Sequence, residues 1–159
     1  MRRSLCVLAL MTACSGGKGE TTADGDVAGQ ALSVGAAWWG GPFIVIVDQD
    51  FDCLDMAWVN RYYEEEEAPT DEDMVALQVT FNEDTIAPGI YDIAGEAALT
   101  VRFLTLTDGI FGIEKGRSGT LVIDEATDEG DLVGTYDIAF DAGSLTGDLG
   151  VEWCANLKG

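Results

Sequence analysis

The sequence predicts a mainly β protein, an antiparallel β-sandwich or barrel of about eight strands with one short helix, preceded by a signal peptide and a flexible tether. Beyond residue 30, short segments alternate apolar with polar residues and are separated by Gly, Pro and Asp turns. The chain is 47% hydrophobic, enough to build a buried core. We divide it into residues 1–13 (signal peptide), 14–29 (tether) and 30–159 (a single β-rich domain).

Residues 1–14 read MRRSLCVLALMTAC. Two arginines precede an apolar run, residues 4–11, which has the length of a signal-peptide core and is too short to span a bilayer. Small residues then lead directly to Cys14, and the stretch resembles a bacterial lipobox, with Met11 where Leu is commonest. The resemblance implies cleavage before Cys14 and acylation of that residue, so that lipid chains hold the protein on a membrane. An ordinary secretory signal, which would leave Cys14 as a free thiol, is the alternative.

Residues 15–29 are small, polar and Gly-rich, which is typical of a flexible tether. Ser15 follows Cys14, where enteric bacteria use Asp to retain lipoproteins in the inner membrane. We therefore expect a lipid-anchored protein of the cell envelope, in the outer membrane, on its periplasmic or its surface face.

The first ordered segments are expected at residues 31–39 and 43–47, separated by a Gly-Gly-Pro break. The second of these, FIVIV, is a continuous β-branched run typical of a central strand.

A short helix is predicted at residues 53–62, because apolar residues recur there at helical spacing and Asp50 or Asp52 can cap the start. A strand is the alternative, since Leu54, Met56 and Trp58 also alternate. The preceding DQDFD stretch is not an EF-hand, because Cys53 occupies the position that requires Gly. Four consecutive glutamates, residues 64–67, then open an acidic segment that we interpret as a solvated loop, dispensable for folding.

Strand patterns follow at regular spacing. They are centred on residues 75–81, 86–93, 99–103, 121–123, 136–140 and 145–153. We expect residues 107–118 to form a long Gly-rich connection, residues 124–131 an acidic hairpin loop, and residues 141–144 a hairpin turn.

The chain has four cysteines. Cys6 leaves with the signal peptide and Cys14 takes lipid, so Cys53 and Cys154 remain as an even pair in an oxidising compartment. We predict that they form a disulfide; two separate buried thiols are the alternative.

The net charge of −21 disfavours nucleic acid and anionic headgroups as partners. The chain has no histidine, which removes Ser-His and Cys-His catalysis and imidazole ligation of zinc. The sequence therefore indicates no catalytic residues, no cofactor and no metal site.

Three short motifs resemble those of small β-rich envelope lipoproteins of uncharacterised function: Pro-Gly-Ile-Tyr at residues 88–91, Ser-Gly-Thr at residues 118–120, and a terminal strand from Gly147 to Cys154. The resemblance implies a β fold and an envelope location, and it implies no activity.

Together these features favour a membrane-anchored, non-enzymatic binding or structural module whose protein or glycan partner is unknown. One alternative is a calcium-dependent adhesion module that uses Asp48, Asp50, Asp52 and the acidic loops. Another is a carboxylate-based glycan hydrolase with Trp38, Trp39 and Trp58 as sugar-stacking platforms, although burial in the core is the commoner fate of such residues.

Overall fold

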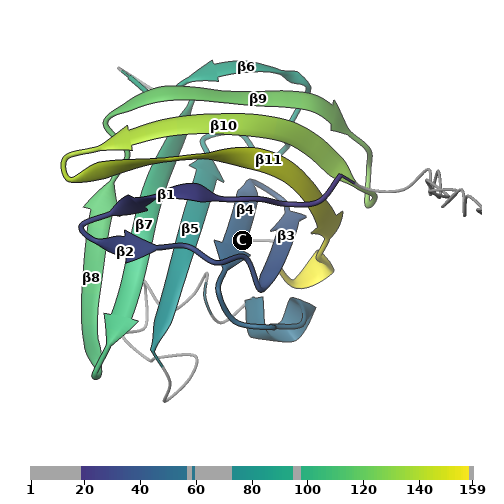
Figure 1. The fold of residues 1–159 in the computed structure, drawn as a ribbon. Helices are drawn as coiled ribbons and strands as arrows, with labels where there is room; N and C mark the ends of the chain where they lie inside the picture. The colour runs from purple at the N-terminus through teal and green to yellow at the C-terminus, as the bar shows by residue number, and fades with distance from the viewer. Residues whose placement is uncertain (1–18, 57–58, 60–72, 95–97, 158–159) are drawn as a thin grey trace, which may run out of the picture.

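The computed structural model describes residues 19–56, 59, 73–94 and 98–157. Within these residues the chain forms eleven β-strands and one short 3-10 turn (Figure 1). They are β1 (Asp24–Val27), β2 (Gln30–Ala31), β3 (Ala36–Gly40), β4 (Phe43–Val47), β5 (Met74–Phe81), β6 (Gly89–Asp92), β7 (Leu99–Thr107), β8 (Ile110–Lys115), β9 (Ser118–Ala126), β10 (Leu132–Phe140), β11 (Gly143–Trp153) and η1 (Ala155–Leu157).

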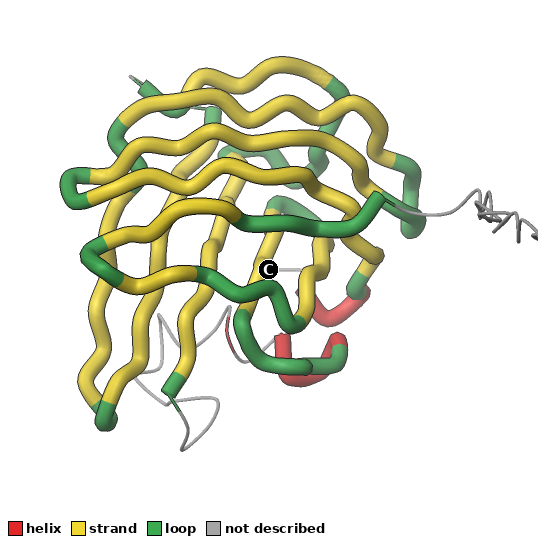
Figure 2. Tube along the Cα trace, viewed as in Figure 1, coloured by secondary structure: helices red, strands yellow, loops and turns green. Residues whose placement is uncertain are grey.

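All strands belong to one strongly curled sheet with the order β6-β9-β10-β11-β3-β4-β5-β7-β8, and β1 pairs with both β11 and β2. In Figure 1, β6, β9, β10 and β11 run across the view, whereas β5, β7 and β8 stand steeply behind them. Described neighbours are antiparallel apart from β11 and β3, which run parallel. The predicted mainly β, sandwich-like or barrel-like fold is confirmed (Figure 2).

The main core lies inside the curl, where the inward residues of both halves meet. On β10, Tyr136, Ile138 and Phe140 are buried while Asp137 between them is exposed, as the alternation predicts. Leu145, Leu149, Val151 and the partly buried Trp153 likewise join the core from one face of β11.

A second, smaller core covers the outer face of β4, β5 and β7. It holds Val45, Met74 and Leu104 under the helical residues 53–56 and under η1. Since β5 lies between the two cores, nearly all of its side chains are buried. Of the helix predicted at residues 53–62, residues 53–56 and Val59 are helical, whereas the remainder and the glutamates of residues 64–67 lie outside the described residues.

Two expectations are wrong in detail. The expected connection at residues 107–118 contains the edge strand β8, which pairs with β7 throughout its length. The expected tether contains β1, which pairs with β11 and buries Val27 completely, so the ordered domain begins before residue 30. In both cases a polar or Gly-containing segment becomes a strand because a neighbouring strand supplies its backbone hydrogen bonds.

Candidate functional site

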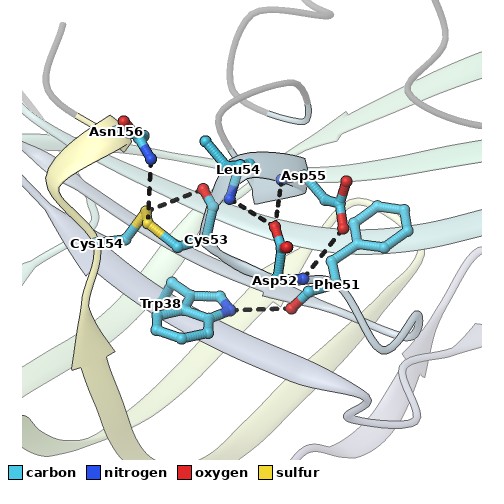
Figure 3. Close-up of a disulfide and its surroundings, with 8 residues drawn as sticks. All are labelled: Trp38, Phe51, Asp52, Cys53, Leu54, Asp55, Cys154 and Asn156. Carbon is cyan, nitrogen blue, oxygen red and sulfur yellow. Dashed lines mark hydrogen bonds between the residues drawn. A yellow bond between two sulfur atoms is a disulfide. The ribbon is translucent and has the colours of Figure 1, made fainter.

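The predicted disulfide is present: Cys53 and Cys154 are bonded, with their Cα atoms 5.4 Å apart (Figure 3). Cys154 is fully buried in the second core, and its N–H donates to the carbonyl oxygen of Trp39 at 2.7 Å. The bond thus fastens the helical turn to the chain just after β11.

The acidic stretch before Cys53 serves local structure. The Asp52 carboxylate accepts hydrogen bonds from the N–H groups of Leu54 and Asp55, and the Asp55 carboxylate accepts one from the N–H of Asp52 (Figure 3). These reciprocal hydrogen bonds cap the start of the helical turn, and Asp52 is one of the two residues predicted as its N-cap. The Asp48 carboxylate accepts from the N–H of Val75 at 2.9 Å. Burial raises the pKa of the Asp48 carboxyl, and this hydrogen bond opposes the rise.

The described residues contain no group of three His, Cys, Asp or Glu side chains positioned to hold a metal ion. Two of the carboxylates considered for calcium, those of Asp48 and Asp52, are engaged by backbone N–H groups. The lipidation candidate Cys14 lies outside the described residues. No helix within the described ranges has the length and apolar character needed to cross a bilayer.

A cleft of about 360 Å³ lies where three connections meet beside the main core. The β3–β4 turn contributes Gly41, the β5–β6 connection contributes Asp84 to Ile86, and the β9–β10 hairpin contributes Asp128 and Glu129. Trp39 and Trp153 complete the lining. Clefts at the mouth of a curled sheet are common positions for ligand sites.

The parallel pairing of β3 with β11 creates the aromatic wall of this cleft. It places Trp39 opposite Trp153, although the two residues are far apart in the sequence. Their ring centroids lie 4.7 Å apart and the planes meet at 73°, an edge-to-face arrangement. The two rings therefore form a corner and not a flat platform.

The β9–β10 hairpin is held in place over Trp39. The indole N–H of Trp39 donates to the carbonyl oxygen of Gly130 at 2.8 Å. Within the hairpin, the N–H of Gly130 donates to the carbonyl of Thr127, and Glu129 adopts a left-handed backbone conformation with φ of 55°. These contacts fix the backbone that carries the carboxylates of Asp128 and Glu129.

Ile86 anchors the β5–β6 connection, because its side chain is buried in the main core. Gly41 has a φ of 52°, which a residue without Cβ adopts without strain and which the tight β3–β4 turn requires. Two of the three sides of the cleft are thus anchored by buried residues, Trp39 and Ile86, and the carboxylates of Asp84, Asp128 and Glu129 line it.

A second polar surface lies on the outer face of the sheet. Register pairs across five strands place acidic and hydroxyl residues in alternation, in the order Asp92, Thr120, Asp137, Thr146 and Asp24. Next to this row, the buried Tyr136 donates its hydroxyl hydrogen to the carbonyl of Thr22 at 2.8 Å. Burial, with smaller contributions from the Asp24 and Asp148 charges, raises the pKa of Tyr136 well above its ordinary value.

The tryptophans proposed for sugar stacking lie in different environments and do not form one platform. Trp39 is 5% exposed and belongs to the main core, so it is not an open platform. Trp38 packs against the second core and donates its indole N–H to the carbonyl of Phe51, and Trp58 lies outside the described residues. The role of Trp153 in the cleft was not foreseen, because only the long-range pairing of β3 with β11 reveals it.

Comparison of the chain with protein-family models, with curated proteins and with solved structures finds no match.

Proposed function

We propose that this chain is an envelope lipoprotein, anchored through lipid on Cys14, whose β domain is a non-enzymatic binding module that presents the Trp39–Trp153 cleft. The observation that carries the anchor is the MTAC sequence directly after an apolar run of signal-peptide length. The Cys53–Cys154 disulfide supports export, because such bonds persist in oxidising compartments. We place the protein in the outer membrane on the basis of Ser15.

A binding role is favoured over catalysis by the chemistry of the chain. Without histidine, the chain lacks the usual general base that operates near neutral pH. The cleft, in contrast, has the features of a binding site: a volume of about 360 Å³, aromatic walls and a small number of fixed polar groups.

The anchor is tested by replacing Cys14 with Ala and following membrane fractionation together with the mass of the N-terminal peptide. We expect the variant to leave the membrane fraction and the native protein to carry an acyl adduct. Cys6→Ala is the matched control, since this cysteine lies within the leader and should not affect anchoring. Unchanged membrane partitioning of the Cys14 variant, with no adduct on the native protein, would refute the proposal.

The binding role is tested separately by capture of partners from an envelope extract with the tagged full chain. The full chain is needed because a version that starts at Gly29 would lack β1, which pairs with β11.

A further inference from the structure

We propose that two copies of this chain pair edge to edge through β8, antiparallel and about a two-fold axis at Ile113, to form a symmetric dimer. The surface is separate from the Trp39–Trp153 cleft, and the inference goes beyond the proposed binding role.

Strand β8 ends the sheet on one side. Within the described part of the chain it pairs with β7 alone, and it lies at the rim of the sheet (Figure 1). It has six residues in continuous register with β7 and contains no proline. The strand at the other end of the sheet, β6, has only four residues and directly follows Pro88, and both features discourage pairing with a further strand. Strand β8 is therefore the better template for such pairing.

The turn before β8 determines which backbone groups face outward. Asp108 and Gly109 have φ angles of 51° and 74°, as in a two-residue type I′ turn, so the flanking pair Thr107–Ile110 is hydrogen-bonded. Hydrogen-bonded and non-hydrogen-bonded pairs alternate along an antiparallel ladder. The N–H and C=O of Ile113 therefore point away from β7, in the direction from which a second strand would bond.

One row of the second core ends at this edge with an exposed side chain. The strand registers place Val47, Ala76, Leu104 and Ile113 in one row across β4, β5, β7 and β8. The first three are buried in the second core, whereas Ile113 is 37% exposed. A two-fold axis normal to the sheet keeps the same face of both copies on one side, so Ile113 of one copy contacts Ile113 of the other. The apolar row then continues from one second core to the next.

Charge favours a second copy in the antiparallel orientation. The chain has a net charge of −21, so most contacts between two copies are disfavoured. Strand β8, in contrast, has Lys115 at one end and follows Asp108 at the other, and both residues are exposed. In an antiparallel pair each Lys115 lies toward the Asp108 end of the other strand, whereas a parallel pair would place like charges side by side. The edge is thus complementary to itself, as a two-fold interface requires.

Cysteine crosslinking of the full chain, purified in detergent and also in envelope extract, tests the proposal. Hydrogen-bonded neighbours across an antiparallel pair have Cα atoms about 5.5 Å apart, which is within disulfide range, so Ile113→Cys should give a covalent homodimer under mild oxidation. Ile90→Cys is the matched control, because this isoleucine is exposed on the other edge strand, β6, and should not crosslink. The unsubstituted chain, oxidised in the same way, gives the background from its own cysteines.

Sedimentation of the purified chain gives a second, non-covalent measurement. Ile113→Lys would place two like charges opposite each other at the axis, and it should raise the dissociation constant of the dimer about tenfold or more. Ile90→Lys adds the same charge at β6 and should leave the dissociation constant within about twofold. Circular dichroism checks that both variants fold.

A chain that sediments as a monomer throughout the concentration range used for crosslinking would overturn the proposal. A dimer that Ile113→Lys does not weaken would overturn it too, and so would equal crosslinking of the two cysteine variants, which would indicate random collision. Crosslinking of the Ile113→Cys variant to a different envelope protein, without a homodimer, would overturn it in favour of a foreign strand. None of these outcomes depends on acylation of Cys14 or on the ligand of the cleft.

Discussion

Breaking the Cys53–Cys154 bond should lower the free energy of unfolding by about 4–5 kcal/mol. The bonded residues are 101 positions apart, and the chain-entropy model gives about 4.7 kcal/mol for a loop of roughly 100 residues. For a domain of this size each kcal/mol corresponds to about 3–4 °C, so the melting temperature should fall by roughly 15 °C. Reduction should act mainly on the unfolded chain, which gains conformational freedom when the bond is broken. The packing of the native state should change little, because both sulfur atoms are still present after reduction.

The assay is thermal unfolding of the full chain, followed by circular dichroism with and without a reductant, with thiol titration to confirm reduction. The double variant Cys53→Ala and Cys154→Ala is the control, since its melting temperature should not respond to the reductant. It should also be slightly less stable than the reduced native chain, because Cys154 is fully buried and its removal leaves a small void. A reduced native chain that melts within about 2 °C of the oxidised one would refute the entropic argument.

Two further predictions concern the segment that precedes β1. Gly147→Ala would place a Cβ 2.0 Å from the carbonyl oxygen of Thr22 and should lower the free energy of unfolding in urea by about 1–3 kcal/mol. Gly89→Ala is the control and should be nearly neutral, because the nearest atom to its Cβ would be 3.6 Å away. Equal effects of the two substitutions would contradict the close packing of β11 against Thr22. The raised pKa of Tyr136 means that the folded state keeps the phenol proton at pH values where the unfolded chain, with a tyrosine pKa near 10, has lost it. The contribution of the neutral Tyr136 to the free energy of unfolding is therefore complete below about pH 10 and is lost as the pH rises above it. A Tyr136→Phe variant should show a shallower alkaline fall in melting temperature than the native chain, and an identical fall in both would count against this role.

The elements that could be predicted are those whose local pattern matches one buried face. Strand β10 alternates strictly because one side meets the core and the other meets water. The disulfide was also predictable, because under the proposed processing only one pair of cysteines, Cys53 and Cys154, would remain in the mature domain.

The elements that could not be predicted depend on partners far away in the sequence. Strand β8 is an edge strand with Gly112 at its middle and Ile110 exposed, so it shows no alternation, and its pairing with β7 defines it. Strand β1 reads as a polar Gly-containing linker until the edge of β11 supplies its partner. The cleft depends in the same way on the parallel contact between β3 and β11, for which the local sequence contains no signal.

If Cys14 carries the proposed lipid, the short stretch between it and the described domain limits how far the domain can move from the membrane. From Cys14 to Gly19, where the described residues begin, there are about five peptide units, which extend to at most roughly 17 Å. A domain of this acidity would then stand only about two Debye lengths from the headgroups at physiological salt. At that separation, repulsion between the acidic domain and an anionic leaflet is largely screened, and it strengthens as the ionic strength falls. The height of a lipid-anchored domain above the bilayer should therefore increase at low salt.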